Sequence, residues 1–338
     1  MPMSETSPYR LCVAPMMEWT DRHCRVFHRL LAPHARLYTE MVTTGAVIHG
    51  HRQRLLDFDP REQPVALQLG GSGPEALAQA ARIGEDWGYA EINLNVGCPS
   101  DRVQTGRFGA CLMREPNLVA ECIAAMRSAV ALPVTVKCRI GVDEQDPLSA
   151  LPEFVRLVSA AGARVFIVHA RKAWLKGLSP RENRDVPPLD YELVYRLKSE
   201  HPDLTIVLNG GLTAVEAVTT ALAAGVDGVM LGRAAYQDPW ILRRLHIALS
   251  EEPHTEFHRA AIVAQYREYI AAMLAQGVPL HAMTRHILGL FNGLPGARVW
   301  RRILSELGPL PQAGLDVVDK AVEAVHTAQL SVAGRTAA

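Results

Sequence analysis

The cysteine at position 98 follows an apolar alternation at the point where a strand should end. Ile92, Leu94 and Val96 recur at every second position, and the chain then turns at Gly97. A thiol in such a loop can serve as a nucleophile, a metal ligand, a proton donor or a small apolar residue. The six cysteines include no C-x-x-C pair and no tight His/Cys cluster, so both a metal site and a disulfide framework are disfavoured.

The remaining roles for Cys98 differ in what they require of its surroundings. A nucleophile needs a lowered pKa and a paired base, and the sequence neighbours of Cys98 offer no base, although a distant histidine stays open. An ordinary thiol, with a pKa of about 8.5, is mostly protonated at neutral pH and can donate a proton without special tuning. We therefore interpret Cys98 as a proton donor, and Cys111, Cys122 and Cys138 as core residues.

Other polar residues follow strand-like runs and suggest an anion site. Lys137 and Arg139 are two apart, so on a strand they point the same way. Unpaired cations near a buried interior are costly without an anion, although a pair of rim cations with buried stems gives the same pattern. Glycines in "LNGG" and "LGRA" would let backbone N–H groups approach a phosphate, with Arg233 closing on it. A phosphate beside Gln68, Lys137 and His169 suits flavin mononucleotide (FMN), which supplies redox chemistry that side chains lack.

Short β-type runs alternate with helical patterns through the first two thirds of the chain. There are eight such runs, at residues 11–16, 37–41, 64–70, 91–97, 133–141, 164–171, 205–211 and 228–234. The alternation predicts a parallel (β/α)8 TIM barrel, in which chemistry sits at the carboxyl ends of the strands. An open doubly wound sheet is the alternative, and it is disfavoured because no run carries G-x-G-x-x-G.

Beyond the last run the pattern is helical only. Amphipathic stretches occupy residues 257–277, 281–294, 296–307 and 316–329, after a short helix at 239–249. The sequence therefore predicts a TIM-barrel catalytic domain over residues 1–245 and a smaller all-helical domain over residues 255–330.

Composition excludes several classes of protein. The 338 residues are 49% hydrophobic, and 35 Lys and Arg residues balance 35 Asp and Glu residues, so no global field points to a nucleic acid. No apolar run of about 18 residues and no signal-like N-terminus occur, so we expect a cytoplasmic protein without a membrane span.

Two local basic stretches could bind nucleic acid although the chain carries no net charge. Residues 171–184 carry Arg171, Arg181 and Arg184 against a single acid, Glu182. Residues 269–305 contain no Asp or Glu, and Arg298 and Arg301 lie on one face of a predicted helix there. Either stretch could be a solvated basic face, but beside a flavin barrel we favour contacts with nucleic-acid phosphates. Trp300, between the arginines, is predicted to be a core residue.

Taken together, the motifs resemble the tRNA-dihydrouridine synthases over nearly the whole chain. The resemblance is carried by "APMMEWTDRHCR", "LYTEMV", "LQLGG", "INLNVGCPS", "VTVKCRIG", "FIVHAR", "LNGG" and "MLGRAAYQDPW". The pairing of "NVGCPS" with "APMM" is highly specific, whereas "NGG" alone is weak. The stretches "MMEWTDRHCR" and "HARKAWLKGLSPRENRDVPPL" are similar to the bacterial A-type subgroup, which is associated with uridines 20 and 20a of the D-loop. Glu18 is the one departure noted, since Asp is more usual there.

The resemblance implies an NADPH-dependent reduction of uridine to 5,6-dihydrouridine, with hydride passing from reduced FMN to C6 and a proton from Cys98 to C5. By the same resemblance, Asn95 orients the uracil, and the helical domain and residues 171–184 bind tRNA. The residues implied to contact FMN are Ala14, Pro15, Met16, Gln68, Lys137, His169, Asn209, Gly210, Gly211, Gly232 and Arg233. We expect a monomer without a metal ion.

Two rival functions are considered. An FMN barrel could act on a small molecule such as dihydroorotate or a dihydropyrimidine, but the basic helical appendage counts against this. An RNA-binding module could keep the barrel without turnover, but the intact set of strand-end residues argues against that.

Overall fold

The computed structural model describes residues 7–100, 103, 106–250 and 258–336. Parallel strands form a nearly closed barrel in the order β1-β9-β8-β7-β6-β5-β4-β2. The strands are β1 (Leu11–Val13), β2 (Leu37–Tyr38), β3 (Val42–Thr43), β4 (Val65–Gly70), β5 (Glu91–Val96), β6 (Val134–Arg139), β7 (Val165–His169), β8 (Thr205–Asn209) and β9 (Gly228–Leu231). The predicted TIM barrel is confirmed, and each of the eight predicted runs contains a strand.

Arg36 closes the ring between its first two strands. Its backbone N–H donates to the Leu11 carbonyl over 2.8 Å, and its carbonyl accepts from the Val13 N–H over 2.9 Å. β3 was not predicted. It pairs only with β4, outside the ring, and two residues are too few to give a period-2 signal.

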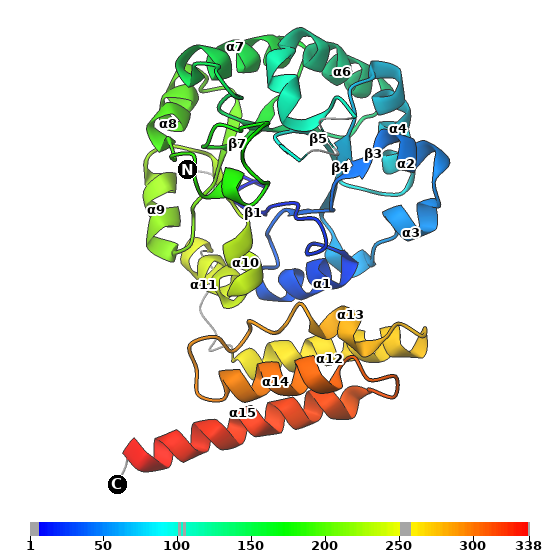
Figure 1. The fold of residues 1–338 in the computed structure, drawn as a ribbon, viewed down its shortest axis with the longest axis vertical. Helices are drawn as coiled ribbons and strands as arrows, with labels where there is room; N and C mark the ends of the chain where they lie inside the picture. The colour runs from blue at the N-terminus through cyan, green and yellow to red at the C-terminus, as the bar shows by residue number, and fades with distance from the viewer. Residues whose placement is uncertain (1–6, 101–102, 104–105, 251–257, 337–338) are drawn as a thin grey trace, which may run out of the picture. The chain divides into compact units, whose positions relative to one another are not determined.

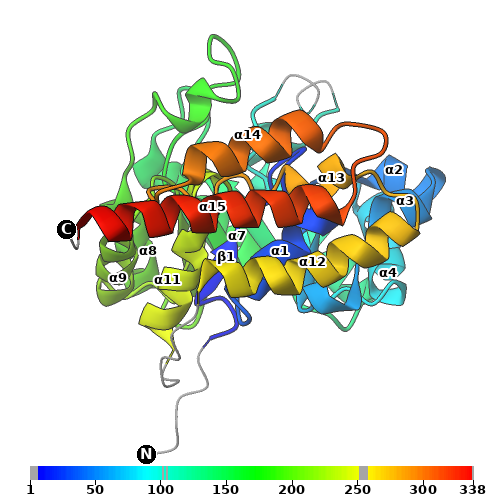
Figure 2. The ribbon, with the colours of Figure 1, turned by 90° about the horizontal axis from the view of Figure 1, so that it is seen from below.

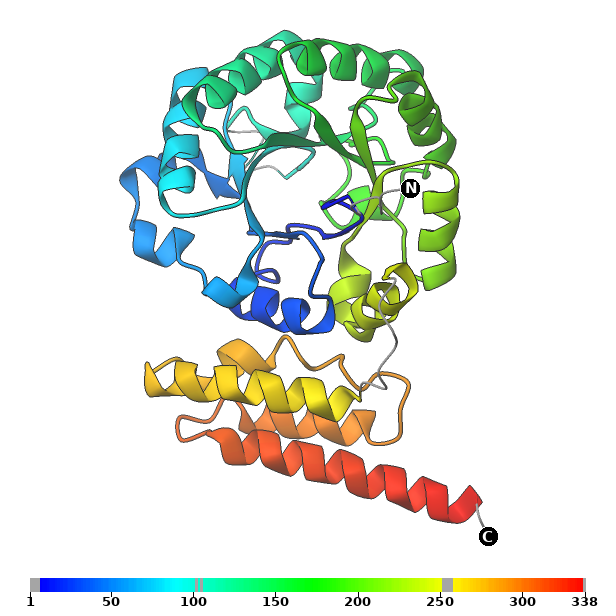
Figure 3. The ribbon, with the colours of Figure 1, turned by 180° about the vertical axis from the view of Figure 1, so that it is seen from behind.

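Helices cover the outer side of the strands (Figures 1 and 3). They are α2 (Thr44–His49), α3 (Arg52–Leu56), α4 (Pro74–Asp86), α6 (Pro116–Ala129), α7 (Pro147–Ala160), α8 (Tyr191–Glu200) and α9 (Val215–Ala223). Apolar side chains such as Tyr38, Ile167 and Met230 fill one layer of the barrel interior, as expected for a packed barrel rather than a pore.

A second compact unit is purely helical. It contains α1 (Arg22–Leu31), α10 (Arg233–Gln237), α11 (Trp240–Leu249), α12 (Arg259–Ala275), α13 (Leu280–Thr284), α14 (Ala297–Leu307) and α15 (Leu315–Thr336). Figure 2 shows α15 running beside α12 and α14, against which it packs. Trp300 of α14 is fully buried and donates from Nε1 to the Ile287 carbonyl over 3.0 Å, which confirms its predicted place in the core.

One predicted helix in this unit is wrong in extent. Of residues 281–294, only the part within Leu280–Thr284 is α-helical, and turns follow. A Cβ on Gly289 would lie 2.3 Å from the Gln237 carbonyl oxygen, and Gly293 has a φ of 77°. These glycines permit a close backbone approach and a reversal that a continued helix would prevent.

Division of the chain by its contacts gives units that differ from the predicted domains. The barrel unit comprises Met1–Thr20 and Ala35–Gly232, and the helical unit comprises Asp21–His34 and Arg233–Ala338. Thus α1, α10 and α11 group with the C-terminal helices by their contacts. The catalytic and tRNA-binding roles assigned to 1–245 and 255–330 stay a prediction. Among the described residues, no helix is long and apolar enough to cross a membrane.

Candidate active site

Predicted site residues of the barrel gather at the carboxyl ends of its strands. Gln68, Asn95, Lys137, His169 and Asn209 are inward-facing polar residues toward the carboxyl ends of β4 through β8. Register brings neighbours together, since Asn95 pairs with Lys137 and His169 pairs with Asn209 across adjacent strands. The strands therefore assemble the predicted set at one mouth of the barrel.

Asn95 holds the loop that carries Cys98. Its Oδ1 accepts from the backbone N–H groups of Gly97 over 3.1 Å and Cys98 over 3.0 Å, and its Nδ2 donates to Gln68 Oε1 over 2.9 Å. Cys98 is half-buried, and within the described part of the chain its Sγ has one side-chain partner, Ser100 Oγ at 3.5 Å. No base contacts the thiol there, which favours a proton donor over an activated nucleophile.

Gly109 is a further residue that shapes the Cys98 loop. It has a φ of 76°, and a Cβ at this position would lie 2.6 Å from the Cys98 carbonyl oxygen and 2.2 Å from Val103 Cγ1. The neighbouring Ala110 N–H donates to that same Cys98 carbonyl over 2.9 Å. Only glycine permits this approach, so Gly109 fixes the far side of the Cys98 loop.

Lys137 is a half-buried cation held by a neutral amide. Its Nζ donates to Asn209 Oδ1 over 3.0 Å, while Asn209 Nδ2 donates to the Met230 carbonyl over 2.7 Å. Burial, followed by the charge of Arg139, lowers the pKa of Lys137 to about 8. Burial and the charges of Arg139 and Lys137 also hold the pKa of His169 well below its ordinary value, so its ring is neutral at pH 7.

Arg139 binds backbone carbonyls, whereas Lys137 binds a side chain, although both point into the barrel mouth. It donates from Nε to the Gly97 carbonyl over 3.1 Å and from Nη1 to the carbonyls of Asn183 and Lys172 over 2.9 and 3.3 Å. The guanidinium thus ties the Cys98 loop to the segment after β7. Of the two cations, Lys137 has the fewer protein partners and is the better candidate for a bound anion.

The segments after β8 and β9 fit a phosphate-bearing cofactor. Gly210 and Gly211 have φ values of 112° and 68°, and added Cβ atoms would lie 2.6 Å from His169 Cδ2 and 2.5 Å from Leu189 Cδ1. Their backbone is therefore open only because side chains are lacking. With the Lys137 cation and the Gln68 amide, this donor set has the chemistry to hold an anionic heteroaromatic group such as FMN.

The remaining predicted cofactor residues directly follow the first and last strands, β1 and β9. Ala14 donates from its N–H to the Leu231 carbonyl over 2.7 Å, so the chain leaving β1 lies beside the chain leaving β9. Gly232 stands next to Ala14 Cβ and Met16 Sδ, Pro15 is half-buried, and Arg233 follows directly as the first residue of α10.

The basic segment after β7 is folded around Asn183, a residue not singled out from the sequence. Its buried side chain donates to the Trp174 and Leu178 carbonyls over 2.8 and 3.1 Å and accepts from the Trp174 N–H over 2.7 Å. Arg181 and Arg184 are exposed on this framework, whereas Arg171 is half-buried and donates to the Pro187 carbonyl. The structure therefore leaves two of the three predicted arginines on the surface.

The helical unit presents its own basic surface. Arg298 and Arg301 are exposed and line a hollow of about 530 Å³ between α14 and α15. Arg301 donates from Nη1 to Asn292 Oδ1 over 2.8 Å. An exposed, little-paired arginine such as Arg298 is available to a phosphate.

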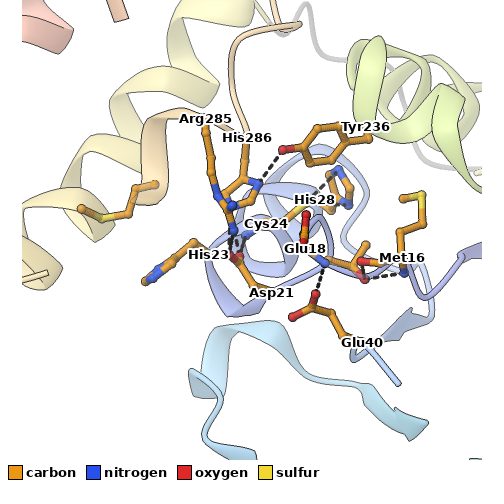
Figure 4. A network of polar contacts seen from close by, with 12 residues as sticks. Met16, Glu18, Asp21, His23, Cys24, His28, Glu40, Tyr236, Arg285 and His286 are labelled. Atoms are coloured by element: carbon orange, nitrogen blue, oxygen red, sulfur yellow. Dashed lines mark hydrogen bonds and ion pairs between the residues drawn. The ribbon is translucent and has the colours of Figure 1, made fainter. Parts of the chain in front are cut away.

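A polar cluster in the same unit brings the acid Asp21 to residues 269–305, which contain no Asp or Glu of their own (Figure 4). Asp21 caps the start of α1 by accepting from the Cys24 N–H over 3.0 Å, and it also accepts from Arg285 over 2.5 Å. His286 Nε2 lies 3.0 Å from Asp21 Oδ1, and Tyr236 Oη lies 3.2 Å from His286 Nδ1. Arg285 is therefore a structural cation of this cluster.

Among the described residues, no group of His, Cys, Asp and Glu is arranged to hold a metal.

Comparison with known proteins identifies the family. Residues 12–327 match the dihydrouridine synthase family. The chain is 61% identical over 318 residues to a tRNA-dihydrouridine(20/20a) synthase of Xanthomonas axonopodis pv. citri, covering 94% of each chain. It is 53% identical over 328 residues to the protein of that name from Vibrio cholerae serotype O1, covering 97% of this chain and 100% of the relative.

A solved structure of a 2-naphthoyl-CoA reductase with 2-naphthoyl-CoA has a similar fold, with a TM-score of 0.55. It is 11% identical, and the match covers 71% of this chain and 50% of that chain, so the likeness concerns the fold alone. The relatives and the family match confirm the resemblance seen in the motifs. The chain therefore belongs to the dihydrouridine synthase family, whose members are flavin-dependent oxidoreductases that form dihydrouridine in tRNA.

Proposed function

We propose that this protein reduces uridines 20 and 20a of the tRNA D-loop to 5,6-dihydrouridine, with bound FMN and with NADPH as the reductant. The names of its relatives support the choice of positions. The observation that carries the chemistry is the half-buried Cys98, which Asn95 holds beside Gln68 at the barrel mouth, and whose thiol no base among the described residues contacts.

Several residues would hold the cofactor. Gln68 offers an amide, Lys137 a cation, and Gly210 and Gly211 an open backbone for the phosphate, with Arg233 next in the chain after Gly232. The remaining cofactor contacts of this proposal are Ala14, Pro15, Met16, His169 and Asn209. When bound, FMN supplies hydride chemistry that amino-acid side chains cannot.

The chain's own residues handle the base and the proton. Asn95 would donate to a carbonyl oxygen of the uracil and so fix its ring in place. The Cys98 thiol would give its proton to C5, and the half-buried sulfur can recover a proton from solvent after product leaves. A D-loop uridine can leave its stack at modest cost to reach this mouth.

The tRNA would be held by exposed arginines of both units, namely Arg181, Arg184, Arg298 and Arg301, with Arg171 supporting the segment after β7. We propose a monomeric cytoplasmic enzyme in which residues 1–245 carry catalysis and residues 255–330 bind tRNA.

The function is tested with the purified protein and unmodified tRNA. We expect a flavin absorption spectrum that NADPH bleaches and that unmodified tRNA restores, with dihydrouridine then mapping to positions 20 and 20a. Restoration by orotate or free uracil in place of tRNA would indicate a small-molecule reductase. A colourless protein that binds tRNA would indicate an RNA-binding module.

A further inference from the structure

A line of buried polar side chains runs through the barrel interior to the candidate site. Glu91, Asn93 and Asn95 alternate along β5, so all three face inward. Their side chains are linked by Gln68 of β4 and Thr135 of β6, and none of these five residues is more than 8% exposed. Polar groups this deep must satisfy one another, because no water competes for their hydrogen bonds.

The hydrogen bonds of this line all run in one direction. Asn95 Nδ2 donates to Gln68 Oε1 over 2.9 Å, and Gln68 Nε2 donates to Asn93 Oδ1 over 2.8 Å. Asn93 Nδ2 then donates to Thr135 Oγ1 over 2.8 Å, and the Thr135 hydroxyl donates to Glu91 Oε1 over 2.5 Å.

The mouth end of the line requires this direction, and the inner end agrees with it. At the mouth, Asn95 must turn its oxygen toward the Gly97 and Cys98 N–H groups, because backbone N–H groups can only donate. At the inner end, the Glu91 side chain accepts from Thr135, and its Oε2 lies 3.6 Å from the cationic Arg36 Nε. With the mouth end fixed, each amide further along the line has one orientation that leaves no donor facing a donor.

This direction determines what Asn95 can offer a ligand. Its oxygen already accepts two backbone N–H groups, and one of its amide hydrogens is given to Gln68. One N–H is left, so Asn95 can donate to a carbonyl oxygen but cannot accept from a ring N–H or an exocyclic amino group. We propose that Glu91, Thr135 and Asn93 are positioning residues that keep Asn95 a pure hydrogen-bond donor toward the carbonyl oxygen of a uracil and steady the Cys98 loop. This inference rests on the proposed function, in which Asn95 orients the base.

The first test breaks the line at Thr135. Thr135→Val keeps the side-chain volume but removes the hydroxyl that accepts from Asn93 and donates to Glu91, and Thr135→Ser restores the hydroxyl as the matched control. With FMN bound, we expect NADPH to bleach the Val variant at nearly the wild-type rate. Reoxidation by saturating tRNA should be roughly ten-fold slower, and the Ser variant should be close to wild type. A Val variant that tRNA reoxidises at the wild-type rate overturns the proposal.

The second test uses thermal unfolding to detect the direction of the hydrogen bonds between Asn95 and Glu91. Asn95→Asp puts an oxygen opposite Gln68 Oε1, so the line must reverse, and the reversed line would end with Thr135 no longer donating to Glu91. Glu91→Gln supplies an N–H for that reversed end. We expect the double variant to unfold at least about 2 °C above the temperature predicted by adding the two single effects. Strict additivity overturns the proposal, because Glu91 and Asn95 stand four positions apart on β5 and, among the described residues, the hydrogen bonds of the line connect them.

The two tests separate the proposal from the function on which it rests. If tRNA does not reoxidise the wild-type protein, the proposed function fails. The unfolding experiment still shows whether the line is directional, since it needs no turnover.

Discussion

The ammonium group of Lys137 donates to Oδ1 of Asn209 over 3.0 Å, so this half-buried cation at the barrel mouth is held by a neutral amide. Asn209 cannot neutralise the charge, and the adjacent Arg139 opposes it. Burial, followed by the charge of Arg139, lowers the pKa of Lys137 to about 8, from an ordinary value of 10.5. A bound anion would relieve this cost, which makes Lys137 the residue whose titration should be visible in cofactor binding.

We expect the affinity of the flavin-free protein for FMN to fall as pH rises through about 8. Lys137 is protonated below its folded-state pKa of about 8 and neutral above it, so its attraction for the anionic cofactor is lost in that direction. The FMN phosphate does not change charge there, because its second pKa is about 6. Quenching of flavin fluorescence between pH 6.5 and 9.5 measures the effect. Lys137→Met should bind FMN more weakly and without this pH dependence, and equal wild-type affinity at pH 7 and 9.5 would contradict the assignment.

The thiol of Cys98 should be needed for turnover but not for the flavin. Cys98→Ala should keep bound FMN and its bleaching by NADPH, and should lose dihydrouridine formation by about 10²- to 10⁴-fold, the usual contribution of a positioned acid. Cys111→Ala is the matched control, since this half-buried thiol donates to the Phe108 carbonyl over 3.1 Å and is not part of the proposed site. Mass spectrometry of the tRNA product reports the difference. Full activity of Cys98→Ala would refute the proton-donor role.

Gly109→Ala should displace the Cys98 loop. Its φ of 76° strains any L-residue, and the added Cβ would meet Val103 Cγ1 at 2.2 Å and the Cys98 carbonyl oxygen at 2.6 Å. Gly177→Ala separates the two effects, because Gly177 has a φ of 82° with nothing within 4 Å. We expect single-turnover reoxidation by tRNA to slow by about ten-fold or more in Gly109→Ala alone. Equal rates in the two variants would show that the close approach at Gly109 does not position the Cys98 loop.

The barrel and its mouth could be predicted because they depend on local patterns. Alternating apolar residues locate each strand, and parallel strands must bring their carboxyl ends to one mouth. The inner part of the polar line could not be predicted in the same way. Glu91 and Asn93 occupy inward positions of β5, where a packed barrel should be apolar, and only the cross-strand partners Gln68 and Thr135 make them acceptable.

The remaining misses come from contacts between distant parts of the chain. The periodicity of residues 281–294 continues past the end of α13, but Gly289 turns the backbone against Gln237, more than 50 residues earlier in the chain. Likewise, the acid-free span that contains Arg285 is neutralised by Asp21, far from it in sequence. The sequence around either residue gives no sign of such long-range contacts.

Asp21→Asn should destabilise the helical unit at neutral pH. Burial raises the pKa of Asp21, but hydrogen bonds from His286, Cys24 and Arg285 outweigh burial and hold it below the ordinary 3.8. Asparagine still caps α1, so the substitution isolates the charge, and we expect a loss of about 2 kcal/mol at pH 7. A carboxylate with a lowered pKa stabilises the fold above its unfolded value and loses this effect as pH falls below it. The difference in denaturant unfolding should therefore shrink at pH 3.

The control for this prediction is Glu153→Gln, which breaks an exposed ion pair with Arg156 on α7. It should leave stability nearly unchanged. A difference between Asp21→Asn and wild type that is the same at pH 7 and pH 3 would show that the cluster contributes through shape and not through charge.

Arg298 and Arg301 should contribute sequence-independent affinity for tRNA. Each phosphate contact releases a counterion, so the double variant Arg298→Ala with Arg301→Ala should lower the slope of log affinity against log salt by about 1 to 2 and weaken binding most at low salt. Arg82→Ala, an exposed arginine on α4, tests for a mere change of net charge and should leave the slope nearly as it is. Filter binding of unmodified tRNA between 50 and about 200 mM salt covers the range in which this effect is large. If the double variant binds tRNA with the wild-type slope, the surface between α14 and α15 does not contact phosphate, and Arg181 and Arg184 on the segment after β7 become the positions to test next.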